Sequence, residues 1–152
     1  MKLNRRTIIK VFGLSILSII VPINYLLASS KKIINSKLSN QQKNIMFNEG
    51  TERPFSSELL NEKRKGFYHC AICGNKLFAS NSKFDSGTGW PSFSEALPGA
   101  YKTKTDYSFG RERVEYHCAK CGAHHGHVFN DGPRESGKRF CSNGLCLIFR
   151  PE

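Results

Sequence analysis

Cys141 and its neighbours have the side-chain types that thiol chemistry needs. Arg139 lies two residues earlier, so both side chains project from the same face of an extended strand. A nearby cation favours the thiolate, which is the nucleophilic form of cysteine. Histidines in the stretch His124-His125-Gly126-His127 are able to deliver a proton. At this point a thiol-dependent enzyme and a cysteine that is only a small buried apolar side chain remain alternatives.

Two cysteine pairs share one spacing and one following residue, in Cys70-Ala-Ile-Cys73-Gly74 and Cys118-Ala-Lys-Cys121-Gly122. Two intervening residues let one tight turn present both thiolates to a single ion, and glycine tolerates the positive φ of such a turn. Four thiolates satisfy a tetrahedral Zn²⁺ completely, which is typical of a structural site. Disulfide pairing after export and a redox-active couple are the alternatives, but the repeated glycine favours zinc.

Residues 1–30 have the composition of an export signal. Basic residues that include the pair Arg5-Arg6 precede an apolar run from Val11 to Leu27, and small residues follow it. The pair, followed by Thr-Ile-Ile-Lys, resembles the twin-arginine signal for export of folded proteins in bacteria. We therefore expect a protein of the bacterial periplasm or an equivalent lumen, which meets the membrane only transiently through this segment. An uncleaved membrane anchor is the alternative.

The rest of the chain divides into two parts. Residues 31–48 are rich in Asn, Gln, Ser and Lys, and they are predicted to form a polar linker. Residues 49–152 are predicted to form one small antiparallel β domain, because short β-type stretches alternate with Gly, Pro and Asp turns. Helix is expected only near its start, over Ser56–Lys65, with Ser56 or Ser57 as the cap. The formal charge of +11 is not gathered into a stripe with aromatic residues, so nucleic-acid binding is not expected.

Four further motifs resemble those of the B-type methionine sulfoxide reductases, and together they span nearly everything from Gly50 to Pro151. The motifs are Thr51-Glu-Arg-Pro-Phe55, Phe84-Asp-Ser-Gly-Thr-Gly-Trp-Pro-Ser-Phe93, His124-His-Gly-His-Val-Phe-Asn-Asp-Gly-Pro133 and Arg139-Phe-Cys-Ser-Asn143. The resemblance implies a peptide-methionine (R)-S-oxide reductase with two β sheets, in a sandwich or roll, and a structural Zn²⁺. It also implies oxidised proteins and peptides as substrates, and a thioredoxin-like protein or a small thiol as the reductant.

The resemblance also implies roles for particular residues. Cys141 matches the nucleophile, and Trp90 matches the aromatic wall that receives the methyl group of the substrate. The polar active-site residues implied by the motifs are His124, His127, Asp131, Arg139 and Asn143. In the implied reaction the Cys141 thiolate attacks sulfur, a histidine protonates oxygen, and a sulfenic acid remains on Cys141.

The chain departs from the family pattern at Thr88, where many members have a resolving cysteine in Ser-Gly-Cys-Gly-Trp. Threonine cannot form the disulfide, so the sulfenic acid on Cys141 must be reduced to the thiol by another route. Cys146 is a possible resolving residue, but an odd offset from Cys141 places the two on opposite faces of a regular strand. We therefore expect direct reduction by an external thiol. His125 replaces a leucine that is often seen in the family, and we expect this change to be tolerated.

Two other functions fit parts of the sequence. The cysteine pairs and the basic charge are also compatible with a zinc-ribbon module that binds acidic ligands. Cys141 and Cys146 are also compatible with a thiol redox sensor that has no substrate turnover. Turnover of methionine-(R)-S-oxide distinguishes the reductase from both.

Overall fold

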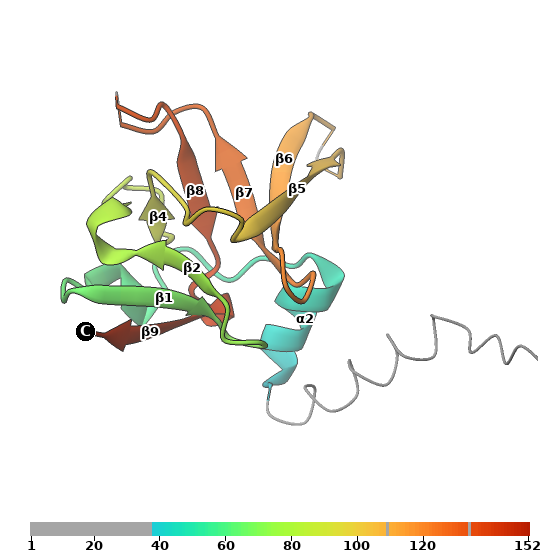
Figure 1. Cartoon of the computed structure of the whole chain (residues 1–152). Coiled ribbons are helices and arrows are strands. Elements are labelled where there is room, and N and C mark those ends of the chain that lie inside the picture. The colour runs from blue at the N-terminus through green and yellow to red at the C-terminus, as the bar shows by residue number, and fades with distance from the viewer. Residues whose placement is uncertain (1–37, 109, 134) are drawn as a thin grey trace, which may run out of the picture.

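The computed structural model describes residues 38–108, 110–133 and 135–152, so the expected export signal at residues 1–30 lies outside the described part. The strands form two antiparallel sheets, which confirms the predicted fold class (Figure 1). The smaller sheet has the spatial order β2 (Lys76–Ala79), β1 (Gly66–Cys70) and β9 (Leu147–Pro151). The larger sheet has the order β3 (Lys83–Phe84), β4 (Ser92–Phe93), β8 (Arg139–Ser142), β7 (His124–Phe129), β6 (Arg113–Cys118) and β5 (Tyr101–Asp106). Within the described ranges, the helical elements are α2 (Asn40–Asn48) and the 3₁₀ turns η2 (Glu58–Asn61), η3 (Ser80–Ser82) and η4 (Gly144–Cys146).

Aromatic side chains fill the space between the sheets. Phe78 of β2 stacks on Phe93 of β4 with ring centroids 4.1 Å apart, and neither side chain is accessible to solvent. Phe140 of β8 and Tyr116 of β6 pack against the same Phe78 ring at 5.7 and 6.0 Å. Burial of rings of this size stabilises a fold by about 1.5–3 kcal/mol each. The two sheets therefore share one core.

The other face of the larger sheet carries polar side chains in register. Residues that pair across neighbouring strands share a face of the sheet. Cys141 of β8 pairs with His127 of β7, and His127 pairs in turn with Glu115 of β6. Arg139 lies two residues from Cys141 and so joins this face. The strands thus separate a core face from a face that carries the chemistry.

An irregularity in β7 brings a second histidine to the polar face. The β6–β7 register shifts between Tyr116 and His117, so His124 pairs with His117 while His127 pairs with Glu115. Glu115 and His117 are two residues apart and share a face, so their partners do as well. His124 and His127 therefore lie on one face although their offset is odd, and the extra residue, His125, is directed to the core side and is fully buried.

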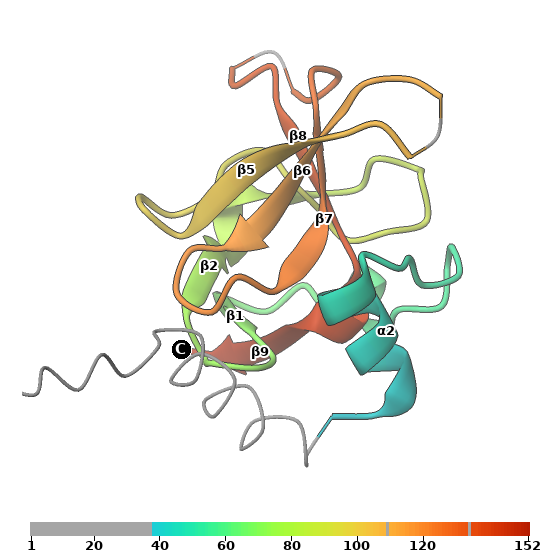
Figure 2. The same ribbon diagram turned by 90° about the vertical axis from the view of Figure 1, so that its right-hand side faces the viewer.

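The prediction of a polar linker over residues 31–48 is wrong for its last nine residues, which form α2. Ser39 caps this helix in a capping box with Gln42, and Glu49 ends it in a left-handed conformation. Ile45 and Met46 are buried in the core, and α2 lies against β7 and η4 (Figure 2). The apolar residues of α2 form one run of three, Ile45, Met46 and Phe47, which produces little helical periodicity and explains the error.

The helix expected over Ser56–Lys65 is shorter than predicted. The structure forms only the 3₁₀ turn η2, and the Ser57 side chain accepts a hydrogen bond from the Leu59 backbone N–H at 3.2 Å, as expected for the cap. Leu59 packs only partly against the core, so little apolar burial supports a longer helix. None of the helices in the described ranges is long and apolar enough to span a bilayer.

Candidate active site and metal centre

Cys141 opens into a pocket of about 110 Å³ at the β7–β8 strand pair. The pocket lining combines apolar and polar side chains and consists of Thr51, Trp90, Arg113, Gly126, His127, Phe129, Cys141, Ser142 and Asn143. A Cβ atom on Gly126 would clash with the Cys141 carbonyl, so only glycine allows the two strands this close approach. Cys141 is partly exposed, and its thiol is not bonded to another cysteine. The thiol is thus reachable by a small side-chain end.

The environment of Cys141 has opposing effects on the pKa of its thiol. Burial raises its pKa above the ordinary value, whereas the charge of Arg139 and the hydroxyl of Thr88 lower it. Thr88 belongs to a hydroxyl chain, because its Oγ1 lies 2.8 Å from Ser86 Oγ, which lies 2.7 Å from Ser92 Oγ. The residue at the position of the expected resolving cysteine therefore lies next to the nucleophile candidate, but supplies a hydroxyl.

Asp131 orients Arg139 and does not line the pocket itself. The guanidinium donates two parallel hydrogen bonds to the Asp131 carboxylate, both at 2.8 Å, and lies over the Phe129 ring at 4.5 Å. A bidentate pair of this kind fixes direction as well as distance. The Arg139 side chain is nearly buried, so the pair holds a cation beside Cys141.

His127 is the histidine that faces Cys141. It lines the pocket, pairs across the strands with Cys141, and its Nε2 lies 2.9 Å from Asp106 Oδ2. Burial lowers the pKa of His127, and the hydrogen bond to Asp106 opposes this effect. Asp106 also pairs with Arg113 and accepts from the Ser108 N–H, contacts that lower its pKa. No role was assigned to Asp106 from the sequence. The available signal was a pair of opposite charges, since Asp106 at the end of β5 pairs with Arg113 at the start of β6.

His124 lies behind His127 and does not line the pocket. Its ring centroid is 5.6 Å from that of His127, and it is 1% exposed. Burial lowers the pKa of His124 to about 4, although the Glu115 carboxylate opposes the shift. His125 packs on the core side, with its ring stacked 6.0 Å from that of Tyr116, and neither of its ring nitrogens has a hydrogen-bond partner. Of the motif histidines, His127 has direct access to a substrate.

Asn143 and Trp90 are joined by Glu52, a residue of the motif Thr51-Glu-Arg-Pro-Phe55 to which no role was assigned from the sequence. The Glu52 N–H donates to Asn143 Oδ1 at 2.9 Å, and the Glu52 carbonyl accepts from Trp90 Nε1 at 3.2 Å. Its carboxylate accepts from the N–H groups of Gly144 and Leu145. Glu52 is almost fully buried, and burial raises its pKa. Asn143 therefore holds the pocket wall together and has both ends of its amide engaged, since its Nδ2 donates to a backbone carbonyl at 3.1 Å.

Cys146 lies away from the pocket. Its side chain is fully buried in the core, it belongs to η4, and burial raises its pKa well above the ordinary value. Bond formation with Cys141 would require part of the core to open.

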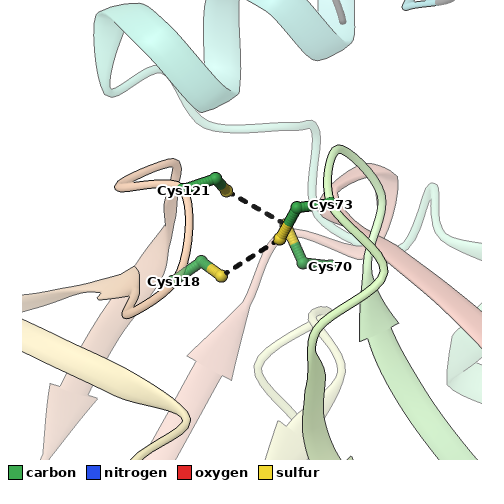
Figure 3. A group of neighbouring side chains, drawn as sticks. All are labelled: Cys70, Cys73, Cys118 and Cys121. Atoms are coloured by element: carbon green, nitrogen blue, oxygen red, sulfur yellow. Dashed lines mark hydrogen bonds between the residues drawn. The ribbon is translucent and has the colours of Figure 1, made fainter. Parts of the chain in front are cut away.

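Cys70, Cys73, Cys118 and Cys121 come together in one cluster, as predicted (Figure 3). The sulfur atoms of Cys70 and Cys121, and those of Cys73 and Cys118, are 3.6 Å apart. All four sulfur atoms lie within 4.8 Å of one another, and none of these cysteines is in a disulfide. Tetrahedral Zn²⁺ with Zn–S bonds of about 2.3 Å places its ligands about 3.8 Å apart, so the donor set fits this ion. Because β1 and β6 belong to different sheets, an ion here joins the two sheets.

The turns that carry the cysteines have the geometry predicted from their glycines. Gly74 and Gly122 have φ values of 68° and 73°, and no neighbour would obstruct a Cβ atom at either position. Their N–H groups donate to the carbonyls of Cys70 and Cys118 at 2.9 and 2.8 Å. Glycine is therefore required by the left-handed backbone and not by lack of space.

Comparison with known proteins identifies relatives over most of the chain. A family model described as SelR domain matches residues 38–151, a range that includes α2. The peptide methionine sulfoxide reductase MsrB of Methanosarcina barkeri is 47% identical over 116 residues, which cover 76% of this chain and 82% of that protein. The enzyme of the same name from Pasteurella multocida is 44% identical, covering 74% and 87%. The mitochondrial methionine-R-sulfoxide reductase B3 of Mus musculus is 43% identical, covering 80% of this chain and 49% of that protein.

Proposed function

Because the chain belongs to the B-type methionine sulfoxide reductases and has peptide-methionine (R)-S-oxide reductase activity, we propose that Cys141 is its nucleophile. The observation that carries this proposal is the position of the thiol. Cys141 faces a pocket beside His127 and a tryptophan, and it lies outside the four-cysteine cluster. The substrates are oxidised methionines in proteins and peptides.

The pocket supports one proposed order of steps. Trp90 receives the S-methyl group, and His127 removes the thiol proton of Cys141 and passes it to the sulfoxide oxygen. The thiolate attacks sulfur, the oxygen is transferred, and methionine leaves. Methionine sulfur is reduced by two electrons and Cys141 sulfur is oxidised by two, so Cys141 becomes a sulfenic acid. His124 acts only through His127 in this scheme, because it does not line the pocket.

The proposed recycling uses an external thiol. One thiol attacks the sulfenic acid and releases water, and a second thiol then releases Cys141 from the mixed disulfide. Thr88 cannot form a disulfide, and Cys146 is sealed in the core, whereas Cys141 is partly exposed. A thioredoxin-like protein or a small thiol fits this route. The same burial of Cys146 argues against a Cys141–Cys146 redox sensor.

We further propose that the four-cysteine cluster holds one Zn²⁺ in a structural role. Four thiolates leave no open position for substrate or water, so the ion would stabilise the fold and take no part in the reaction. The ligands are Cys70, Cys73, Cys118 and Cys121.

Mass spectrometry after a single turnover without reductant tests the proposed chemistry. The expected product is one added oxygen, or its dimedone adduct, on Cys141, with Cys146 unmodified. Cys141→Ser should lose turnover by about 10³-fold or more while keeping its zinc. Full turnover by Cys141→Ser would overturn the assignment, and a Cys141–Cys146 bridge would replace the recycling route.

Export by the twin-arginine route is a separate proposal for residues 1–30, supported by Arg5-Arg6 and the apolar run that follows. In a bacterial host the chain should be found outside the cytoplasm with its N-terminal segment removed. Arg5→Lys together with Arg6→Lys should retain it in the cytoplasm. Unchanged export of this double variant would contradict the twin-arginine route.

A further inference from the structure

Three metal-ligating side chains gather on the polar face of the larger sheet, apart from the four cysteines. Glu115, His117 and His124, together named the Glu115 site, offer ligand atoms that lie within 4.8 Å of one another. Glu115 and His117 share a face of β6, and His124 of β7 pairs with His117 across the strands. The bulge at His125 is what places His124 on this face.

The ligand atoms of the Glu115 site lie close together, and its two imidazole nitrogens lack a hydrogen-bond partner. Glu115 Oε1 lies 3.2 Å from His117 Nε2, and Glu115 Oε2 lies 3.2 Å from His124 Nδ1. Neither contact has the direction of a hydrogen bond, and both imidazole nitrogens are buried without a hydrogen-bond partner. Glu115 and His124 are each 1% exposed. Buried polar atoms normally have partners, and a bound cation would supply one to both nitrogens.

We propose that Glu115, His117 and His124 form a second metal site, which binds a divalent transition-metal ion. Two imidazoles and a carboxylate suit Zn²⁺, Co²⁺, Ni²⁺ or Cu²⁺, whereas the cluster of thiolates suits Zn²⁺. Metal–ligand bonds of about 2.0–2.2 Å place neighbouring ligand atoms about 3.0–3.5 Å apart. Both separations of 3.2 Å between a Glu115 oxygen and an imidazole nitrogen fall within this range.

Lys104 competes with the metal ion for the Glu115 site. It pairs with Glu115 across β5 and β6, and its Nζ lies 2.8 Å from Glu115 Oε1 and 2.6 Å from Glu49 Oε1. The Lys104 side chain is half-exposed, so it can leave Glu115 and keep Glu49. An ammonium group beside a carboxylate weakens the binding of a dication there, so removal of this charge should strengthen the site.

Occupation of the Glu115 site would affect the reductase, a consequence that rests on the proposed function. A metal bound at His124 Nδ1 lies one imidazole away from His127, whose ring centroid is 5.6 Å from that of His124. A positive charge there disfavours a proton on His127. Metal binding should therefore slow proton transfer to the sulfoxide while the pocket itself stays open.

Cobalt titration of the zinc-loaded protein tests the site. The protein contains Cys141→Ser, so that the partly exposed thiol cannot bind the ion; Cys146 is also outside the cluster but is fully buried. One equivalent of Co²⁺ should bind with weak visible ligand-field bands and no intense thiolate-to-cobalt charge-transfer band. His117→Gln should abolish this binding while one zinc per chain and the circular dichroism spectrum remain. His125→Leu, which removes a neighbouring histidine outside the site, should bind cobalt as the parent does.

Lys104→Met should have the opposite effect to His117→Gln and increase the affinity for Co²⁺ by about tenfold. In the protein with Cys141 intact, the second metal equivalent should slow turnover, and His117→Gln should remove this inhibition. Cobalt binding that survives His117→Gln, or no binding by either the parent or Lys104→Met, would overturn the proposal. Because the spectra are recorded on a variant without Cys141, they decide the metal site whether or not Cys141 is the nucleophile.

Discussion

The four-cysteine cluster and the Cys141 pocket place the same side chain in two different surroundings. Partial exposure does not distinguish them, because Cys73, Cys121 and Cys141 are all partly buried. What differs is what each sulfur faces. In the cluster, sulfurs from two sheets face one another, whereas Cys141 faces Arg139 and Thr88 at an open pocket. Neighbours that a thiol meets in the fold, more than its depth, determine whether it holds the fold together or reacts.

Replacement of a cluster ligand should have the largest effect and should act on stability alone. Cys118→Ser leaves the four-cysteine cluster one ligand short, so we expect loss of the proposed Zn²⁺ and destabilisation on the order of 5 kcal/mol. Thermal unfolding and zinc stoichiometry measure this outcome. Cys141→Ser is the matched control, with an unfolding temperature within about 3 °C of the parent. If Cys118→Ser unfolded at the same temperature as the parent, the four-cysteine cluster would not stabilise the fold more than Cys141 does.

Asp131→Asn should show that the surroundings of Cys141 serve reactivity and not folding. The change breaks the bidentate contact with Arg139, so the cation is no longer held in direction. We expect kcat/KM to fall by about 10–100-fold, with a change of about 1 kcal/mol or less in the free energy of unfolding, because Asp131 is largely exposed. Steady-state kinetics and chemical denaturation measure the two effects. A fall in stability as large as that of Cys118→Ser would contradict this view.

The pH dependence of alkylation should separate burial from charge at Cys141. Burial raises the pKa of this thiol, so its reaction with iodoacetamide should increase with pH through a midpoint above the ordinary value for cysteine. Arg139 opposes this effect, so Arg139→Gln should move the midpoint to higher pH by about 1 unit. Stopped-flow alkylation from pH 6 to 10 gives both curves. A midpoint that moves to lower pH would mean that Arg139 does not stabilise the thiolate.

Thr88→Cys should have the smallest effect on the first chemical step, because it changes only how Cys141 is regenerated. After one turnover without reductant we expect a disulfide between position 88 and Cys141, detected by peptide mapping. The rate of the first methionine release should stay within about threefold of the parent. Thr88→Ser is the control that keeps the hydroxyl and cannot form the disulfide. Persistent sulfenic acid in Thr88→Cys would show that the two side chains do not meet.

Local features of the site were predictable from the sequence. The spacing of Cys70, Cys73, Cys118 and Cys121 itself dictates turns that present paired thiolates, and the cluster formed as expected. The two-residue offset between Arg139 and Cys141 likewise predicted that they share a face of the strand. In the structure both lie on β8, and the charge of Arg139 acts on the Cys141 thiol. Such inferences succeed because backbone geometry over a few residues determines the outcome.

Features that depend on distant partners were not predictable. The local sequence does not reveal the contacts of Glu52 and Glu115, since Glu52 acts through residues about ninety positions later and Glu115 through neighbouring strands. The different roles of His124 and His127 depend on the β6–β7 register, which one sequence does not reveal. The burial of Ile45 and Met46 in α2 was not predicted for a similar reason, because it depends on where β7 and η4 lie.

The bulge at His125 has a consequence for how this segment can change in length. Deletion of His125 would remove the extra residue and leave His124 and His127 two positions apart, still on one face of a regular strand. Insertion of one further residue there would instead require a bulge of two residues to keep His124 opposite His117. In a library of insertions and deletions, loss of codon 125 should therefore be tolerated better than gain of a codon at the same place.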